Sequence, residues 1–540
     1  MAVLSCIYIP WVALPVAAAQ TVIVQRDSFS QSVSVAQLRE IETKGAIPLS
    51  LKDYASTLTS WQQGKILAAL QAKLDIEATQ LQQLLATDLG QRLVHVLAGA
   101  TTLATPEAKA AVQNAFIGAA ESSEGLSVLS FIEAYPRNSL EIDLERVFLV
   151  LGNFNAAFWQ TQAFMAQIAP QLTSQQTAKF SFTLDPSQPG TEEVQVISEF
   201  LDDSVRQRRI PVAIYWSRAA SQKKPIIVFS HGLGSVNFDL RYLAQHLASH
   251  GYVVAALEHP GSNSDHLDNA LWNWLFHNIP PLQAEEFLER PQDVSFLLDQ
   301  LAILNQSPGL LEGKLATDNV LILGYSLGGS TSLALAGGQF QLENLKQRCR
   351  GKFLAFSFGE NAQCFARGLP QDRYRLRDPR IKAAIAFSPT ASLLFGNSGL
   401  SQIEVPTLMT SASADKTTPA LTEQVIPFTQ IVQPKWLVGF VSGTHLSVKD
   451  PSTTTDQVDN PNTIYTGGEI IDQEAVEVRK YIKAITLAMA AQLTDQASRY
   501  RPFLTPEYAQ FSSTGRFPIR LVREIPPEAQ AIIDEVITLD

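Results

Sequence analysis

The feature that most constrains this chain is a series of short apolar segments between residues 226 and 441, separated by helical patterns. These segments are apolar at nearly every position, which is typical of strands buried on both faces of a sheet. Strands of this kind that alternate with helices predict a mostly parallel sheet covered by helices on both faces. The expected strands are 226–229, 253–257, 320–323, 381–387, 407–410 and 436–441, preceded by alternating strands at 179–184 and 211–216; the expected helices are 239–250, 291–304, 327–337 and 473–493.

The preceding part of the chain has a helical pattern instead. Leucines recur at three- and four-residue steps between residues 61 and 98, which indicates one apolar helix face, broken near Asp75. Ahead of them, residues 21–32 look extended. Other helices are expected between a Ser34/Gln37 capping box and Gly45, and after Thr105, Glu124 and Ser139.

The first residues of the chain have the pattern of an export signal. Residues 2–19 contain no charge, are largely apolar and end in three alanines before Gln20. Such a segment is typical of a signal peptide cleaved after Ala19. No Lys or Arg precedes the apolar run and two prolines interrupt it, so a membrane anchor or a buried first helix stays the alternative. The expected location of the protein is periplasmic or secreted.

Composition excludes several classes of protein. An apolar share of 46% and a charged share of 17% describe a soluble globular chain rather than a disordered or multispanning one. The net charge of −11, without a basic run, offers no footprint for nucleic acid. Histidines and cysteines do not cluster with the spacing of metal ligands, so neither a metal nor an organic cofactor is expected.

Two cysteines stay in the chain if Cys6 leaves with the signal, namely Cys349 and Cys364. An even pair in an exported protein suggests a disulfide that closes a short loop. Two free thiols in separate places are the alternative.

The sharpest motif is the segment Gly-Tyr-Ser-Leu-Gly at residues 324–328, directly after an expected strand and at the start of a helix. This is the context of a nucleophile elbow, in which a tight strand-to-helix turn exposes a strained nucleophile. The residues two positions away must lack side chains to avoid collision, and the helix N-terminus favours developing negative charge. Ser326 is therefore the predicted nucleophile of an α/β-hydrolase fold.

A serine hydroxyl is a weak nucleophile and needs a base that an acid holds in place. Of the eight histidines only His445 follows Ser326, in the loop after the last expected strand, where this fold carries its base. Asp415, in the loop after the preceding strand, is the predicted acid. Glu404 and Asp450 are the alternatives for that role.

A second loop rich in glycine, Ser-His-Gly-Leu-Gly at residues 230–234, follows the strand expected at 226–229. An oxyanion hole needs two backbone N–H groups aimed at the tetrahedral oxygen. The predicted donors are the amides of Leu233, in this loop, and of Leu327, directly after the nucleophile. His231 is interpreted as structural and not as the base. An ordinary glycine turn is the competing interpretation.

Two segments together resemble known families. The runs VFSHGLG at 228–234 and LASHGYVVAALEHP at 247–260 resemble platelet-activating-factor acetylhydrolases and dienelactone-hydrolase-like bacterial esterases. The resemblance covers roughly residues 190–490 and implies an α/β-hydrolase fold with acyl-ester hydrolysis. The helical segment from about 20 to 150 resembles the N-terminal domain of unknown function found on exported, largely cyanobacterial α/β-hydrolases.

The chain departs from the acetylhydrolases in its expected acid. Acetylhydrolases carry the acid after the sixth strand, where this chain has Ser388-Pro389-Thr390, whereas Asp415 follows the dienelactone-hydrolase placement. This departure weakens a phospholipid assignment and leaves acyl-ester hydrolysis intact. Ser326 at the elbow excludes the cysteine nucleophile that dienelactone hydrolases use.

The patterns divide the chain into four parts. A signal peptide at 1–19 precedes a small all-helical domain at 20–168, an α/β-hydrolase catalytic domain at 175–495 and a proline-rich extension at 496–540 that wraps the surface. Residues 339–378 are the expected lid over the acyl pocket. Three aromatic residues of another excursion either line that pocket or pack in the core, namely Trp272, Trp274 and Phe276.

Taken together, these residues predict a serine hydrolase that cleaves carboxylic esters, lipid-like or short-chain, through an acyl-enzyme. Acyl transfer to an alcohol or sugar, and cleavage of a polymer such as a polyester, use the same triad and stay open. The non-enzymatic alternative is an α/β-hydrolase scaffold used for binding. The expected partner is a small-molecule or lipid ester, contact with a membrane surface stays open, and no obligate protein partner is inferred.

Overall fold

The computed structural model describes residues 19–143 and 184–533 apart from internal gaps, together with Thr161 and Phe164; the longest gaps are 53–69, 87–93, 268–281, 350–356 and 454–468. The chain divides into two compact units, Met1–Phe154 and Asn155–Asp540. Several predictions lie outside the described residues: the export signal, most of the strand at 179–184, and the aromatic residues Trp272, Trp274 and Phe276.

The N-terminal unit is not all-helical, which corrects the sequence prediction. It contains a three-stranded sheet in the order β2-β1-β5, in which β1 pairs antiparallel with β2 and parallel with β5. The helix expected after Ser139 is the strand β5, because Leu140 and Ile142 alternate with polar residues and pair with β1 from far away in the sequence. The strands are β1 (Thr21–Arg26), β2 (Phe29–Ser34) and β5 (Ser139–Asp143).

Helices complete this unit, and several of them begin or end where the sequence predicts. Ser34 and Gln37 form the predicted capping box of α1, and Gly45 ends that helix in the left-handed conformation at φ 65°. The predicted break near Asp75 coincides with a two-residue strand, β3, which pairs with β4. The elements are α1 (Val35–Lys44), β3 (Lys73–Leu74), α4 (Ala78–Ala86), α6 (Thr105–Glu121), β4 (Leu126–Ser127) and α7 (Val128–Glu133).

The C-terminal unit is built on a nine-stranded sheet in the order β16-β15-β14-β13-β10-β8-β9-β7-β6. The strands from β9 to β15 run parallel, and β6, β7 and β16 add antiparallel pairs at the two edges. The strands are β6 (Gln195–Asp203), β7 (Arg208–Trp216), β8 (Pro225–Ser230), β9 (Val253–Leu257), β10 (Ala316–Tyr325), β13 (Ile381–Phe387), β14 (Thr407–Ala412), β15 (Lys435–Phe440) and β16 (Ile519–Val522).

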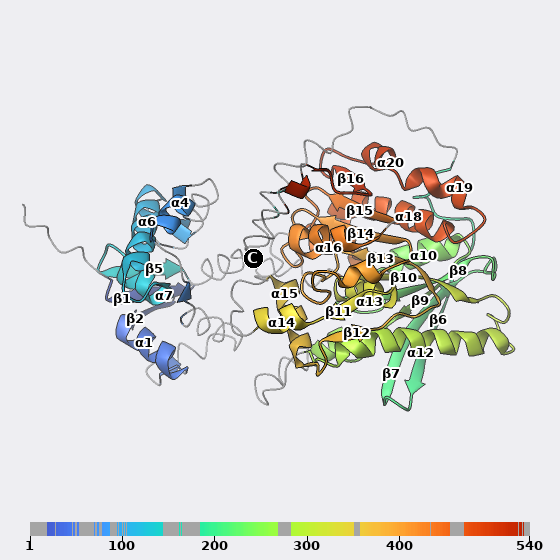
Figure 1. Ribbon diagram of the computed structural model, residues 1–540, viewed down its shortest axis with the longest axis horizontal. Helices are drawn as coiled ribbons and strands as arrows, with labels where there is room; N and C mark the ends of the chain where they lie inside the picture. Colours follow the sequence, from blue (N-terminus) through green and yellow to red (C-terminus); the bar gives the residue numbers. More distant parts are fainter. Residues whose placement is uncertain are drawn as a thin grey trace, which may run out of the picture. The chain divides into compact units, whose positions relative to one another are not determined.

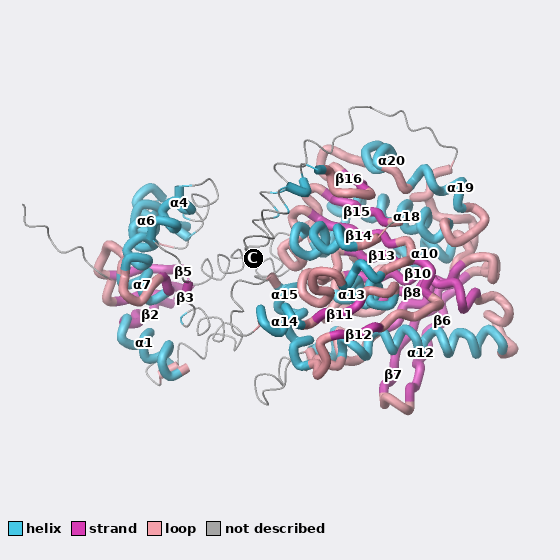
Figure 2. Tube along the Cα trace, viewed as in Figure 1, coloured by secondary structure: helices cyan, strands magenta, loops and turns pink. Residues whose placement is uncertain are grey.

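Helices cover both faces of this sheet (Figures 1 and 2). Alternate residues of each strand enter two separate apolar cores: Val228 packs on the side of α12 and α13, and Ile227 packs on the side of α10 and α18. The strand order, the parallel centre and these two helical layers form an α/β-hydrolase fold, as the sequence predicts. The helices are α10 (Arg241–Ser249), α12 (Glu286–Gln306), α13 (Leu327–Leu335), α16 (Ile426–Gln430), α18 (Val476–Ala491), α19 (Ala497–Tyr500) and α20 (Pro506–Phe511).

Residues 339–378 form a compact excursion between α13 and β13. It contains β11 (Gln339–Gln341), α14 (Glu343–Arg348), α15 (Phe358–Gln363) and β12 (Arg373–Arg375), which pairs antiparallel with β11. The expected disulfide is present between Cys349 and Cys364, both of them buried. The role of this excursion as a lid stays a prediction.

The extension at 496–540 does more than wrap the surface, which corrects a second prediction. Its strand β16 pairs antiparallel with β15 and completes one edge of the central sheet. Phe517, Ile519 and Leu521 are buried in the core beside α18. The alternation of apolar and polar residues in β16 covers only four positions and lies among prolines, so the sequence pattern does not indicate a strand there.

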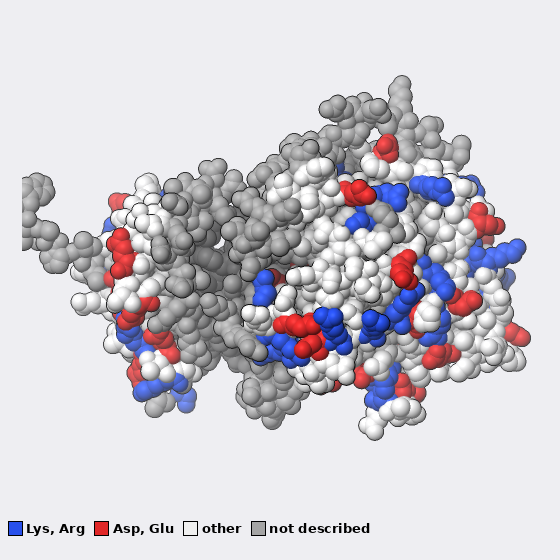
Figure 3. Space-filling view, viewed as in Figure 1, with Lys and Arg blue, Asp and Glu red and all other residues white. Residues whose placement is uncertain are grey.

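The surface carries charges of both signs. On the face shown in Figure 3, acidic and basic side chains of the C-terminal unit are interspersed rather than gathered into a patch of one sign. Among the described helices, none is both long and apolar enough to cross a membrane.

Candidate active site

Ser326 lies at the turn from β10 into α13, in the middle of the C-terminal unit. Its backbone has φ 56° and ψ −120°, a conformation that non-glycine residues rarely adopt. The turn is held from the neighbouring strand, because the Ser326 N–H donates to the carbonyl of Phe387 at 2.9 Å. The sequence motif therefore folds as the strained elbow that it predicts.

The two glycines of the motif are required by close packing. A Cβ atom on Gly324 would lie 2.0 Å from the carbonyl oxygen of Gly328, and one on Gly328 would lie 1.9 Å from the carbonyl oxygen of Ser230. Backbone atoms cannot move away as a flexible side chain can, so any other residue would open the turn. The second contact also shows that the end of β8 lies directly against the elbow.

Asp415 and His445 are brought together by two loops at the carboxyl ends of β14 and β15. His445 Nδ1 lies 2.7 Å from Asp415 Oδ2, and both side chains are buried. A carboxylate at Nδ1 fixes the ring so that its Nε2 can act as a base. The structure thus pairs the two residues that sequence order nominated.

Thr418 is a residue that the sequence reasoning missed. Its backbone N–H donates to Asp415 Oδ1 at 2.7 Å, and its hydroxyl lies 2.8 Å from Asp415 Oδ2 and 3.1 Å from His445 Nδ1. Because both carboxylate oxygens are engaged, the acid has a fixed orientation toward the imidazole. The spacing Asp-x-x-Thr in the loop was the available signal, since a carboxylate commonly caps the amide three residues on.

Tyr325 connects the nucleophile turn to the base loop. Its hydroxyl donates to the backbone carbonyl of His445 at 3.2 Å, and its ring centre lies 4.9 Å from that of the imidazole. The residue next to Ser326 therefore contacts His445 through both its ring and its hydroxyl group.

The alternative acids lie elsewhere. Glu404 forms an exposed ion pair with Arg377 at 3.0 Å. Asp450 accepts from the backbone N–H of Tyr242 at 2.9 Å and from Ser452, which ties the loop after His445 to the start of α10. Neither has a contact with His445 among the described residues.

The predicted oxyanion donors lie on either side of the elbow. Leu327 opens α13 directly after Ser326. In the other loop, a Cβ atom on Gly232 would lie 3.2 Å from Ser326 Cβ, so the residue before Leu233 faces the nucleophile. Within the described residues, neither the Leu233 nor the Leu327 amide donates to a backbone carbonyl.

Glu469 is a second carboxyl group beside the base, and sequence reasoning did not find it. Its Oε2 accepts from the backbone N–H of Leu446 at 2.9 Å. Burial, together with the charge of Asp415, raises the pKa of Glu469 to about 7, while His445 opposes that shift. This carboxyl, which lies close to the Asp415–His445 pair, therefore titrates near neutral pH.

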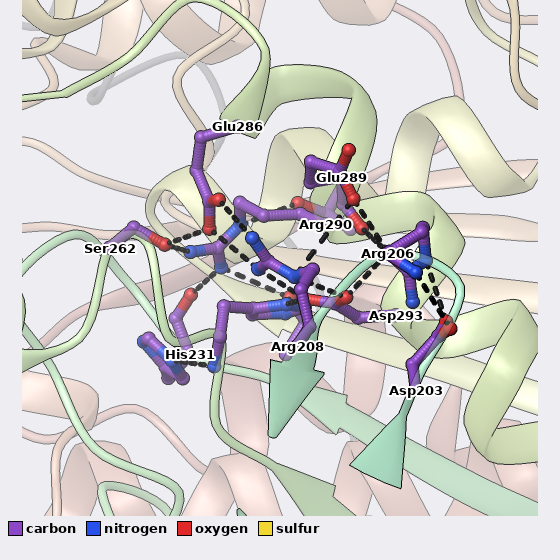
Figure 4. A network of polar contacts seen from close by, with 12 residues as sticks. Asp203, Arg206, Arg208, His231, Ser262, Glu286, Glu289, Arg290 and Asp293 are labelled. Atoms are coloured by element: carbon purple, nitrogen blue, oxygen red, sulfur yellow. Dashed lines mark hydrogen bonds and ion pairs between the residues drawn. The ribbon is translucent and has the colours of Figure 1, made fainter. Parts of the chain in front are cut away.

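A group of charged side chains lies behind the loop at 230–234. Figure 4 shows carboxylates of α12 pointing toward the arginines of the β6–β7 hairpin. Arg208 Nη2 lies 2.7 Å from Asp293 Oδ2, and Arg206 Nη1 lies 2.7 Å from Glu289 Oε2. We call this group the charge network; it consists of Asp203, Arg206, Arg208, Glu286, Glu289, Arg290 and Asp293.

The sequence had placed no function on this part of α12 and had expected Pro291 at its first position. That expectation is wrong: α12 begins at Glu286, so Pro291 lies inside the helix. The additional first turn carries Glu286, which pairs with Arg208, and it leads to Arg290, which donates to the His231 carbonyl in the loop after β8. Burial lowers the pKa of Arg290 to about 10, which leaves its guanidinium charged at neutral pH.

Three residues in this region have the atoms of a metal site. His259, Glu286 and Asp293 offer potential ligand atoms that all lie within 4.8 Å of one another. Arg208 already pairs with both carboxylates, and a cation placed there would meet that guanidinium. We therefore assign no metal ion to these residues.

Comparison with protein families gives two matches. Residues 18–143 match a family described as an alpha/beta hydrolase of unknown function, and residues 192–270 match platelet-activating factor acetylhydrolase, isoform II. The second match includes the loop at 230–234 and ends before Ser326. The C-terminal unit has the α/β-hydrolase fold, and the chain resembles the acetylhydrolases at the segments that the sequence nominated.

Individual relatives are distant. The chain is 27% identical over 135 residues to platelet-activating factor acetylhydrolase of Cavia porcellus, which covers 20% of this chain and 31% of the relative. It is 26% identical over 189 residues to the protein of that name from Bos taurus, covering 30% of this chain and 41% of the relative. The chain therefore spans less than half the length of these curated relatives.

Proposed function

We propose that this chain hydrolyses carboxylic esters, lipid-like or short-chain, with Ser326 as nucleophile, His445 as base and Asp415 as the acid that orients the base. The observation that carries the proposal is the strained turn at Ser326 combined with the buried 2.7 Å contact between Asp415 and His445. The likeness to acetylhydrolases supports ester hydrolysis as the reaction class.

In the proposed mechanism, His445 takes the proton of Ser326 as the serine oxygen attacks the ester carbonyl carbon. The amides of Leu233 and Leu327 donate to the oxygen that becomes negative, while Asp415 stabilises the imidazolium. His445 then gives its proton to the leaving alcohol, which leaves an acyl group on Ser326. Water, activated by the same imidazole, releases the acid and restores the serine.

The test of this proposal is a panel of p-nitrophenyl esters from acetate to palmitate, run with the wild type and with Ser326→Ala. We expect hydrolysis of part of the panel by the wild type and loss of at least about 10⁴-fold in the variant. A fluorophosphonate should label the wild type at Ser326 and leave Ser326→Ala unlabelled. A wild type that neither hydrolyses an ester nor takes the label contradicts the proposal.

We further propose that the protein works in an oxidising compartment, periplasmic or extracellular. The buried disulfide between Cys349 and Cys364 supports this, because such bonds persist mainly outside reducing cytosols. Fractionation of the source cells followed by thiol labelling tests the proposal. Recovery of the protein in the cytosolic fraction, with both thiols free, would contradict it.

A further inference from the structure

His231 is fully buried beside the nucleophile turn, and each of its ring nitrogens has one partner. Nδ1 lies 2.6 Å from the carbonyl oxygen of Gly232, and Nε2 lies 2.8 Å from the backbone nitrogen of His259. A carbonyl can only accept and a backbone N–H can only donate, so the proton of the ring must be on Nδ1 and Nε2 must accept. The hydrogen bonds therefore require a neutral ring of one defined tautomer.

The environment agrees with that protonation state. Burial, together with the charge of Arg290, lowers the pKa of His231 well below its ordinary value. The ring consequently stays neutral across the pH range in which an esterase operates.

The carbonyl that His231 holds belongs to the peptide group of the predicted oxyanion donor. The peptide bond between Gly232 and Leu233 is planar and trans, so the Leu233 N–H points opposite to the Gly232 carbonyl. Fixing that carbonyl against the imidazole fixes the direction of the N–H. Because Gly232 faces Ser326, this one hydrogen bond controls an amide next to the nucleophile.

Arg290 fixes the preceding peptide group of the same loop. Its Nη2 donates to the carbonyl of His231 and, at 3.1 Å, to the hydroxyl of Ser230. Its Nε donates to Thr331 Oγ1 at 3.1 Å, and Thr331 lies on α13 behind the nucleophile. One guanidinium therefore joins the oxyanion loop to the helix that carries the elbow.

His259 completes the arrangement and fixes the partner of His231. Asp293 Oδ2 lies 2.9 Å from His259 Nδ1 and as a carboxylate can only accept, so the ring proton is on Nδ1. Burial, together with the charge of Arg290, lowers the pKa of His259 well below its ordinary value, so the ring is neutral and its Nε2 accepts from the Ser230 hydroxyl, 2.9 Å away. Because both ring nitrogens of His259 are hydrogen-bonded, the residue is held in a position from which its backbone N–H donates to His231 Nε2. Each hydrogen-bonding group between the charge network and the Leu233 amide thus has a defined donor or acceptor role.

We propose that His231 is a positioning residue of the oxyanion hole, which aims the Leu233 amide at Ser326 by holding the Gly232 carbonyl, and that the charge network anchors it through Arg290 and His259. This inference rests on the proposed ester hydrolysis. It assigns a role in transition-state stabilisation to a histidine outside the Ser326, Asp415 and His445 triad.

Two substitutions of His231 separate its two hydrogen bonds. The amide nitrogen of His231→Asn lies where Nδ1 was and can donate to the Gly232 carbonyl. The amide oxygen of His231→Gln lies where Nε2 was and can accept from His259, but the side chain leaves the Gly232 carbonyl unheld. We expect kcat to fall about 10²–10³-fold in His231→Gln, the loss seen when one oxyanion donor is removed. In His231→Asn we expect kcat within about tenfold of the wild type, with KM little changed in both variants.

A second measurement reports on the oxyanion directly. A trifluoromethyl ketone forms a tetrahedral adduct with a catalytic serine, whereas the matching methyl ketone does so poorly. We expect the affinity of His231→Gln for the trifluoromethyl ketone to fall by about the same factor as kcat, while its affinity for the methyl ketone changes less than threefold.

The control is His246→Gln, because His246 is also a buried histidine but lies on α10, away from the loop at 230–234. It should lose stability and keep kcat within threefold, which measures the cost of replacing any buried histidine. Equal losses of kcat in folded His231→Asn and His231→Gln, or a loss confined to KM, overturn the inference. If His231→Gln does not fold, a folded His231→Asn that has lost 100-fold in kcat overturns it alone. An active wild type with an equally active His231→Gln refutes this inference only, whereas an inactive wild type refutes the proposed function and this inference with it.

Discussion

The two sides of Ser326 are held by different chemistry. On one side, Asp415 and His445 are carried by loops and fixed by short hydrogen bonds from Thr418 and Tyr325. On the other side, the loop that carries Leu233 rests on the charge network, in which Arg206 and Arg208 pair with four carboxylates and Arg290 donates to the loop itself. The proposed acid and base are thus held mainly by hydrogen bonds, whereas the loop of the proposed oxyanion donor is anchored by a group of ion pairs.

The difference matches the tasks of the two sides. A base must accept and return a proton in each cycle, so its surroundings must tolerate a change of charge on the ring. An oxyanion hole works only if its donors are already oriented before the charge develops, because reorientation during the reaction would cost free energy. We therefore expect changes on the base side to reduce rate with little effect on stability, and changes on the oxyanion side to affect both.

The largest effect on rate is expected from Asp415→Asn. The amide can still fill the space but favours the wrong tautomer of His445, so kcat should fall about 10⁴-fold, equivalent to about 5.4 kcal/mol of barrier. Urea unfolding should change little. A variant that keeps a tenth of wild-type kcat would show that Asp415 is not the acid, and Asp450→Asn would then be measured in its place.

Asp293→Asn tests the opposite side. Removing one charge leaves Arg206 and Arg208 with an incomplete set of buried carboxylates, which should lower the free energy of unfolding by about 3–5 kcal/mol. Urea titration measures this value. Glu343→Gln, which breaks an exposed ion pair with Arg373, should cost about 0–1 kcal/mol and serves as the control. Equal costs for the two substitutions would show that the charge network contributes no more to stability than an exposed ion pair does.

A smaller loss of rate is expected from Thr418→Val. The valine removes the hydroxyl donor to Asp415 but keeps the backbone N–H, so kcat/KM should fall about tenfold, or about 1.4 kcal/mol. Thr417→Val is the matched control, because the buried Thr417 hydroxyl has no hydrogen-bond partner among the described residues. If the control loses as much as Thr418→Val, the orientation of Asp415 does not depend on that hydroxyl.

The last prediction concerns Glu423, a buried carboxyl that has no arginine beside it among the described residues. Glu423 accepts from the backbone N–H groups of Ala391 and Ser392, and burial, together with the charge of Glu360, raises its pKa to about 8. The folded state therefore binds this proton more tightly than the unfolded state does. Its contribution to stability is full below about pH 4.3, the ordinary glutamate value, and is lost as the pH rises to about 8.

Glu423→Gln should consequently reduce the fall in the urea midpoint between pH 5 and pH 8. The exposed Glu404→Gln serves as the control and should leave that fall unchanged. A fall of wild-type size in Glu423→Gln would show that ionisation of Glu423 is not the cause of the pH dependence of stability.

The residues of the proposed triad could be nominated from the sequence because their signals are local. An apolar strand followed by a glycine-framed serine places Ser326 on a turn, and the order of loops along the chain nominates Asp415 and His445 without any knowledge of contacts. The strands of the central sheet could also be predicted, since burial on both faces leaves an unbroken apolar run in the sequence.

The charge network was not accessible in that way. Arg290 lies 60 residues after Ser230 in the sequence, and its charge and the neighbouring Pro291 read as the exposed start of a helix. Only packing of α12 against the end of β8 converts these polar residues into a buried anchor. The strand β5 was not predicted for the same reason, because its partner β1 is more than a hundred residues away in the sequence.

The strand β16 has a consequence for the order in which the central sheet is completed. It is the outer neighbour of β15, the strand that leads into the loop of His445, yet it leaves the ribosome long after β15 does. Until residue 522 emerges, β15 has one open edge and the base loop lacks its outer support. The turn at Ser326 can therefore form well before the sheet edge beside the His445 loop is closed.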